Sequence, residues 1–160
     1  MGEHDGMGDL MGRIGLAAVA LATTTLAIAG CGGSSAKPLT RAELTAKANV
    51  ICKTVTTRFA SKSINSQQEM ARVIPELAAF EQTALAELSK LVPPAELAND
   101  WKKFVAGAET LAENTAKLGE YAKAKNIKAA GSLITGSEAI QQQMRATAKQ
   151  DGITACEKVT

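Results

Sequence analysis

The chain has 160 residues, of which 46% are hydrophobic, 21% are charged and only 3% are aromatic. This length accommodates one modest core and excludes a second domain of ordinary size. The apolar content is too high for a wholly disordered chain. The formal net charge is +2, and Lys102-Lys103 is the only pair of adjacent basic residues. A nucleic-acid-binding face normally carries a concentrated basic patch, so we expect no nucleic-acid partner.

An uncharged apolar run occupies residues 14–29, immediately after Arg13. A basic flank followed by an apolar run of this length is typical of a secretory signal. As a helix the run would be about 24 Å long, shorter than the roughly 30 Å hydrocarbon core of a bilayer, so residues 1–30 are predicted to be a cleaved signal rather than a permanent span. The acidic stretch before Arg13 is unusual in such a signal and leaves the start open. The candidate start residues are Met1, Met7 and Met11.

The apolar run ends Leu26-Ala27-Ile28-Ala29-Gly30-Cys31, which resembles the bacterial lipobox: a branched aliphatic residue, two small residues and a cysteine. The resemblance implies a lipoprotein whose mature first residue is Cys31, alkylated on its thiol and acylated, for example with palmitate, on its amine. Two or more acyl chains are needed for stable anchoring. We therefore expect the membrane to be a partner through Cys31, at the extracytoplasmic face of the cell membrane. The alternative is an apolar helix that ends by chance at a free cysteine.

A flexible tether is predicted over residues 31–39, because the stretch after Cys31 is rich in glycine and serine and cannot pack. The folded domain is then predicted to cover residues 40–160.

Residues 40–160 show helical periodicity throughout. They contain no alternating run of β-branched residues and no Asn-Gly or Asp-Gly hairpin signal, so the domain is predicted to be all-α. Two capping boxes, a proline suited to a first helical position and a capping asparagine predict four helix starts. Gly152 predicts a left-handed stop, with Ile153 as the hydrophobic contact beyond it. The four start signals are Thr40/Glu43, Ser66/Glu69, Pro94 and Asn126.

Four helices with short connections favour an up-down-up-down four-helix bundle. Pro75 falls within the second predicted helix, where it removes a hydrogen bond, so we expect either a kink or a break into two shorter helices. The third helix carries a heptad seam with steps of four and three. Many core positions are alanine, which predicts close helix contacts and little room for a large cofactor. The seam residues are Leu97, Trp101, Phe104, Ala108, Leu111, Thr115, Leu118 and Ala122.

Two further cysteines lie in this domain, Cys52 in the first predicted helix and Cys156 in the C-terminal tail. An exported chain with one pair left is expected to oxidise it. The geometry agrees, because an up-down bundle places the start of its first helix beside the end of its fourth, and the tail after Gly152 can run back along it. The alternative, a reactive thiol pair, lacks a Cys-x-x-Cys spacing and a nearby histidine.

Three segments carry a resemblance to a group of small, alanine-rich helical lipoproteins from actinobacteria. They are Pro38-Leu39-Thr40-Arg41-Ala42-Glu43 leading to Cys52, Leu91-Val92-Pro93-Pro94-Ala95-Glu96-Leu97, and Gly152-Ile153-Thr154-Ala155-Cys156. The resemblance covers nearly the whole mature chain and implies a helical fold and a place in the envelope. Its motifs are caps, turns and a cysteine pair, so it assigns no catalytic residue.

The single histidine, His4, is removed with the signal if cleavage precedes Cys31. That excludes Ser-His and Cys-His nucleophiles, histidine metal sites and the commonest general base from the mature chain. The densest acids, Glu109, Glu113 and Glu120, fall off the seam and alternate with lysines, so they are expected to form ion pairs within the helix. No glycine-rich phosphate loop is present. We therefore predict that the protein is not an enzyme and uses no metal or cofactor.

The fourth predicted helix is the most polar and least helix-favouring element, since it contains Gly131 and Gly136 among several serines, threonines and glutamines. One interpretation is close helix packing with a solvated face. The other is a surface that meets a partner or borders a small groove. The residues of this candidate face are Trp101, Tyr121, Ser132, Ser137 and Gln141.

These observations favour a membrane-anchored, non-enzymatic helical module of the cell envelope that binds or scaffolds, with an envelope protein as its expected partner. Two alternatives stay open. A carrier of a small apolar ligand within the bundle needs a cavity, which the alanine-rich seam disfavours. A carboxylate-based enzyme needs two acids facing each other in an apolar cleft.

Overall fold

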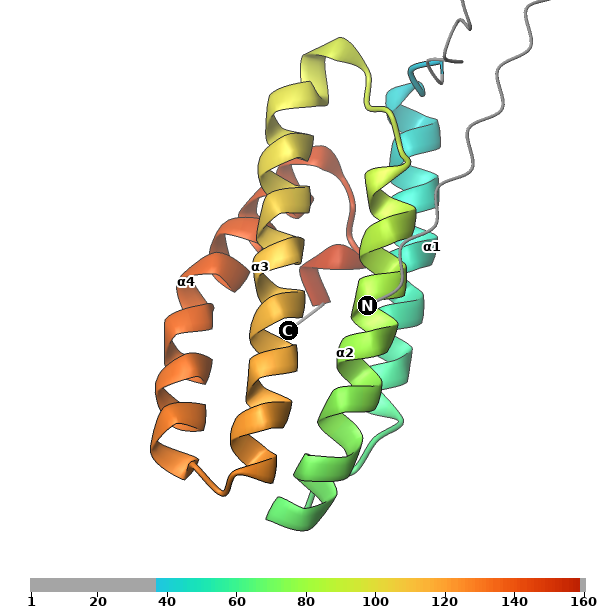
Figure 1. Ribbon diagram of the computed structural model, residues 1–160. Helices are drawn as coiled ribbons and strands as arrows, with labels where there is room; N and C mark the ends of the chain where they lie inside the picture. The colour runs from blue at the N-terminus through green and yellow to red at the C-terminus, as the bar shows by residue number, and fades with distance from the viewer. Residues whose placement is uncertain (1–36, 159–160) are drawn as a thin grey trace, which may run out of the picture. The chain divides into compact units, whose positions relative to one another are not determined.

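The computed structural model describes residues 37–158, where every regular element is a helix (Figure 1). Consecutive helices run in opposite directions and pack against each other, so the predicted all-α, up-down-up-down bundle is confirmed. The predicted signal peptide and Cys31 lie outside the described residues. The elements are α1 (Arg41–Ala60), α2 (Gln67–Ser89), the 3-10 turn η1 (Ala95–Leu97), α3 (Ala98–Lys123), α4 (Ile127–Asp151) and the 3-10 turn η2 (Cys156–Lys158).

Helix α1 begins with the predicted capping box. The Thr40 hydroxyl oxygen accepts a hydrogen bond from the Glu43 backbone N–H at 3.2 Å, and a Glu43 carboxylate oxygen accepts one from the Thr40 N–H at 2.8 Å. These two bonds satisfy backbone donors that the first helical turn leaves free. The bond from the Thr40 N–H lowers the pKa of Glu43, and so does a bond from the Thr40 hydroxyl to the same carboxylate oxygen at 2.8 Å, because both favour the charged carboxylate.

The second capping box forms only in part. Ser66 accepts from the Glu69 backbone N–H at 3.1 Å as predicted, but the Glu69 carboxylate accepts from the N–H of Asn65 at 2.8 Å instead of from Ser66. The predicted cap of α4 is present, with the Asn126 side-chain oxygen accepting from the Ala129 N–H at 3.1 Å.

Of the two prolines that the sequence singled out, one lies within an unbroken helix and the other precedes its helix instead of starting it. Helix α2 continues through Pro75 without a break. The buried Gly119 of α3 faces this proline, and an added Cβ there would lie 3.2 Å from the proline ring, so the glycine makes room for it. Pro94 was predicted to occupy the first position of the third helix, but it precedes η1, and α3 begins at Ala98.

The end of α4 follows the prediction closely. Gly152 has a left-handed backbone with φ of 75°, which glycine adopts without steric cost. Its N–H donates to the carbonyl of Lys149, and the N–H of Ile153 donates to the carbonyl of Ala148 at 2.8 Å, the two bonds of a Schellman motif. Ile153 is only 1% exposed, so the reversed chain is anchored in the core.

Helix α3 lies between α2 and α4 and has the most extensive contacts with both (Figure 1). Its seam residues Trp101 and Phe104 are buried, with stacked rings whose centroids are 5.5 Å apart. Ala112 and Gly119, which are not on the seam, are buried too. A helix with neighbours on two sides buries a wider surface than one seam.

The predicted pairing of Cys52 with Cys156 is present as a disulfide, with the two Cα atoms 5.0 Å apart. It joins α1 to η2. Asn49 supports the same contact, because its side-chain oxygen accepts from the Ala155 backbone N–H at 2.8 Å. The C-terminal segment therefore packs against both α4 and α1.

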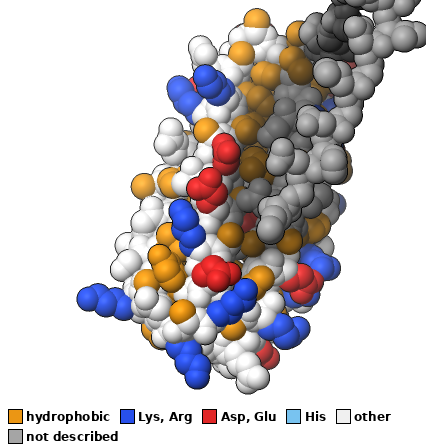
Figure 2. Space-filling view, in the orientation of Figure 1, with side chains coloured by type: hydrophobic (Ala, Val, Ile, Leu, Met, Phe, Trp, Pro, Cys, Tyr) orange, Lys and Arg blue, Asp and Glu red, His pale blue; other side chains and the backbone are white. Residues whose placement is uncertain are grey.

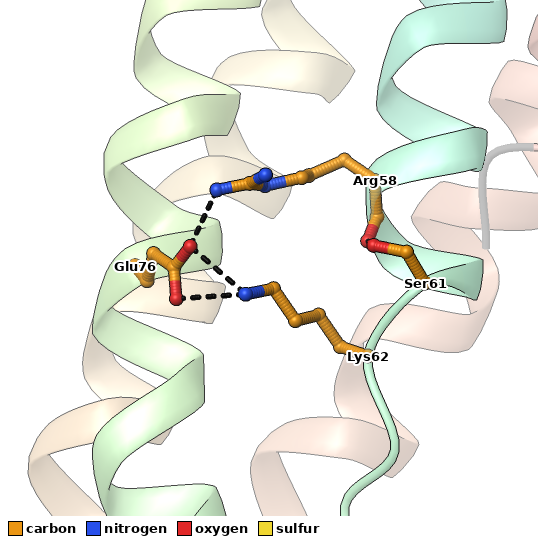
Figure 3. A network of polar contacts seen from close by, with 4 residues as sticks. All are labelled: Arg58, Ser61, Lys62 and Glu76. Carbon is orange, nitrogen blue, oxygen red and sulfur yellow. Dashed lines mark hydrogen bonds and ion pairs between the residues drawn. The ribbon is translucent and has the colours of Figure 1, made fainter.

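At its other end, α1 is held to α2 by ion pairs on Glu76. Figure 3 shows this carboxylate between the side chains of Arg58 and Lys62. Both carboxylate oxygens accept from the Lys62 ammonium at 3.0 Å, and this contact is the main reason that the pKa of Glu76 is lowered. The network lies beside the connection between α1 and α2 and fixes the last turn of α1.

Candidate functional site

A groove opens between α1 and α4, the two helices that a closed bundle would bring together. They do not pack closely, and the described part of the C-terminal segment, residues 152–158, lies between them at the disulfide end. Further along α1 the space remains as a groove of about 510 Å³ with walls from all four helices. The alanine-rich seam predicted little room for a large cofactor between closely packed helices; this groove arises where α1 and α4 separate. The apolar lining includes Phe59, Leu111, Leu118, Leu133 and Ile134.

Among the described residues, Glu81 of α2 is the one that places a carboxyl group in the wall of this groove. Its Oε2 atom is buried and has no hydrogen-bond partner among the described residues. Burial disfavours the charged form and raises the pKa of Glu81 from 4.5 to about 7, with a hydrogen bond from Thr115 opposing the rise in part. A carboxyl group in such surroundings is costly for folding, and groups of this kind gather at functional sites.

The hydroxyl groups of the groove donate their protons in hydrogen bonds within the protein. Thr56, Thr115 and Ser137 each donate to the backbone carbonyl four residues earlier, at 2.9, 3.0 and 2.8 Å. Thr115 has one proton, which can serve this carbonyl or Glu81 but not both. The Asn114 amide nitrogen donates to the Ser137 hydroxyl at 3.0 Å. The hydroxyl groups of the groove therefore offer acceptor oxygens, whereas its N–H donors are those of Asn114, Gln141 and Lys158.

A smaller cavity of about 50 Å³ adjoins the groove inside the bundle. Glu81 and Leu111 line both spaces. The remaining walls of the inner cavity are apolar or disulfide-bonded side chains, among them Val55, Phe104 and Met144. Glu81 thus stands between an open groove and an apolar interior.

Another surface hollow, of about 560 Å³, lies between α1 and the C-terminal segment and is lined by Asn49, Lys53 and Thr154 among others. No buried acid or base lines it. Among the described residues, Asp151 is the one acid that is buried as a whole residue, at 4% exposure; its Oδ1 atom has no partner, and its pKa is raised by burial and by the nearby Asp100. It lines neither hollow, so the groove with Glu81 is the better candidate site.

The acids that the sequence singled out lie elsewhere. Glu109, Glu113 and Glu120 are exposed, and two of them pair within α3 as expected, Glu113 with Lys117 at 4.0 Å and Glu120 with Lys123 at 3.2 Å. Between residues 37 and 158, no three histidine, cysteine or acidic side chains come together as a metal site. On the face in Figure 2, basic and acidic side chains are interspersed.

The structure brings together only part of the predicted partner face. Ser137 and Gln141 line the groove. Trp101 is only 4% exposed and belongs to the core, while Tyr121 is half-buried and lines no part of the groove. Ser132 is exposed on α4.

The two glycines of α4 are not explained by close packing within the chain. A Cβ atom at Gly131 or Gly136 would have no contact within 4 Å. The close approach of α3 to α4 occurs at Gly107 instead, where a Cβ would lie 2.7 Å from the Met144 Cγ atom. The packing interpretation of Gly131 and Gly136 is therefore wrong.

Sequence reasoning did not identify Glu81. The residue lies four positions after Leu77 and seven before Leu88, so helical spacing places an acid on the same stripe as two buried leucines. A lone carboxylate on an apolar stripe was the available signal. The apolar residue Phe80 beside it obscured that signal, because it also fits the stripe.

None of the helices within residues 37–158 is long and apolar enough to span a membrane. Comparison with protein-family models, curated proteins and solved structures finds no match to this chain. The resemblance to actinobacterial lipoproteins therefore stays a prediction.

Proposed function

We propose that this protein is a lipid-anchored, non-enzymatic binding module of the cell envelope, and that it takes a small ligand in the groove between α1 and α4. The observation that carries the proposal is the buried, unpartnered carboxyl oxygen of Glu81 in the wall of a 510 Å³ groove. Ligand sites are concave and mostly apolar with a few placed polar groups, and this groove fits that description. The groove lining holds one carboxylate, which favours binding over two-acid catalysis.

The anchor rests on the lipobox-like sequence that ends at Cys31 and on the Gly/Ser-rich stretch after it. Leu39, where the folded domain begins, donates its N–H to the Val92 carbonyl in the α2–α3 connection at 2.9 Å. This bond attaches the start of the domain to the end of the bundle that is opposite the α1–α2 connection. A lipid on Cys31 would accordingly hold that end toward the membrane.

Native extraction of the protein from its own cells tests both parts of the proposal. Mass analysis is expected to show a lipid-modified Cys31 at the mature N-terminus, and an unmodified cysteine or an intact Met1 would contradict the anchor. Native mass spectrometry is expected to show a co-purified small molecule. That molecule should be lost from an Ile134→Trp variant, since Ile134 lines the groove and is 50% exposed. Ile127→Trp is the matched control, because Ile127 is 63% exposed on the same helix and lies outside the groove.

A scaffolding role with an envelope protein is the second candidate, and the outer face of α4 favours it. Gly131 and Gly136 have open space where a side chain would stand, and Ser132 between them is exposed. A photo-crosslinker at position 132 is expected to capture a protein in intact cells if this face is an interface. The same crosslinker at Lys53, an exposed position on α1, is the control. Recovery of the same proteins from both positions would count against the scaffolding role.

A further inference from the structure

We infer that the groove selects a primary ammonium compound with an apolar body, whose ammonium group pairs with the Glu81 carboxylate. The inference rests on the proposed function, because it names the ligand class of the same groove. It is carried by three features: the hydrogen-bonding pattern of the wall, the charge inside the wall, and the apolar surface around the charge.

The hydrogen-bonding pattern favours a ligand that donates. The protons of Thr56 and Ser137 point to backbone carbonyls of their own helices, so their oxygens remain as acceptors. The Asn114 amide donates one of its two N–H groups to the Ser137 hydroxyl, and its carbonyl oxygen remains an acceptor. Glu81 adds two acceptor oxygens when it is ionised. A primary ammonium group carries three N–H donors and no acceptor, which complements these acceptor oxygens.

The charge in the wall favours a cation. Of the residues between 37 and 158 that line the groove and the inner cavity, Lys158 is the only charged one besides Glu81. Lys158 is exposed and forms no ion pair with Glu81 in the described structure. No neighbouring charge from α1, α3 or α4 contributes to the raised pKa of Glu81, which burial alone produces. The carboxylate is thus without the counter-charge that a buried ion requires, and a ligand ammonium would supply it.

Apolar side chains that can contact the hydrocarbon part of the ligand lie on both sides of Glu81. Phe59, Leu118 and Leu133 line the groove, and Phe104 and Met144 line the inner cavity. A short hydrocarbon chain attached to the ammonium carbon can therefore contact apolar side chains while the nitrogen stays at the carboxylate. A small cation without an apolar body, such as the ammonium ion, would leave this surface unused.

The test compares three probes of equal chain length: pentylamine, 1-pentanol and pentanoate. The full chain is carried in lipid nanodiscs, empty nanodiscs serve as the blank, and dissociation constants are measured by ligand-observed NMR. Pentylamine is expected to bind at least about tenfold more tightly than either other probe. Glu81→Gln removes the charge while keeping the shape and should abolish that preference. Glu87→Gln, an exposed acid on the same helix, is the matched control and should retain it.

The pH profile of the unsubstituted chain gives a second test that requires no variant. Pentylamine stays protonated over this range, so its affinity follows the ionisation of Glu81. With a pKa of about 7, the affinity should fall about tenfold between pH 8 and pH 6. Pentanol that binds as tightly as pentylamine, or a pentylamine affinity that ignores both Glu81→Gln and pH, would overturn the ammonium assignment while leaving the groove as the site. Failure of all three probes to bind would overturn the groove itself.

Discussion

Glu81 makes a prediction about stability that can be tested before any ligand is known. Its pKa is 4.5 in ordinary surroundings and about 7 in the folded protein, because folding removes its carboxyl group from water. Each pKa unit corresponds to about 1.4 kcal/mol, so the charged carboxylate lowers the free energy of unfolding by about 3 kcal/mol. We expect the Glu81→Gln variant to avoid this loss of stability, because glutamine carries no charge to bury.

The sign of the pH dependence follows from which state binds the proton. Between pH 4.5 and pH 7, the unfolded chain has lost the Glu81 proton and the folded chain keeps it, so stability falls as pH rises through this window and levels off above about pH 7. Relative to the unsubstituted chain, Glu81→Gln should therefore gain about 3 kcal/mol between pH 4.5 and pH 8, which is about 10 °C in midpoint temperature. The other acids, including Asp151, are common to both chains and cancel in the comparison.

Thermal unfolding followed by circular dichroism at 222 nm measures the effect, with the full chain in lipid nanodiscs at pH 4.5, 6 and 8. Glu87→Gln is the control, because Glu87 is exposed and pairs only with Lys90 on the surface. The refuting result is a difference between Glu81→Gln and the unsubstituted chain that stays constant over the pH range. Such a result would mean that water or protein groups solvate the carboxylate fully in the folded state.

Four further predictions concern the scaffold. Replacing both Cys52 and Cys156 by alanine should destabilise the fold by about 4 to 5 kcal/mol, or about 15 to 20 °C in thermal unfolding. The reason is that the disulfide closes a loop with a sequence separation of 104 and so restricts the unfolded chain. A decrease in midpoint temperature of under about 5 °C would contradict this chain-entropy argument. Gly136→Ala should stabilise by about 0.5 to 1 kcal/mol, since nothing lies within 4 Å of the added methyl group. Gly107→Ala should destabilise the fold by about 1 kcal/mol or more, because its methyl group would lie 2.7 Å from the Cγ atom of the buried Met144 in α4. Equal effects of Gly136→Ala and Gly107→Ala on stability would contradict this difference in packing between the two positions. Thr40→Ala should cost about 1 kcal/mol in urea unfolding by removing the α1 cap, whereas an unchanged midpoint would show that the cap is dispensable.

The local features of this protein follow from short stretches of sequence. The capping box at Thr40, the cap at Asn126 and the left-handed turn at Gly152 depend on backbone groups within a few residues, so their residue types were enough to predict them. The same holds for the heptad seam and, through the bundle topology, for the pairing of Cys52 with Cys156. Where an outcome depended on a distant contact, prediction was weaker. Whether α2 would break at Pro75 could not be read from α2, because the glycine that accommodates the proline is on α3.

The sequence by itself determined the helical class, the helix ends and the cysteine pair, because these depend on local hydrogen bonds, periodicity and connection length. It also carries the lipobox-like motif at Cys31, on which the proposed anchor rests. Only the tertiary structure decided that α1 and α4 stay apart, that the C-terminal segment closes just one end of the gap, and that Glu81 lines what remains. The physical reason is that burial is a property of the assembled helices. The same carboxylate on the same stripe would be an ordinary surface acid if the neighbouring helices left it in water.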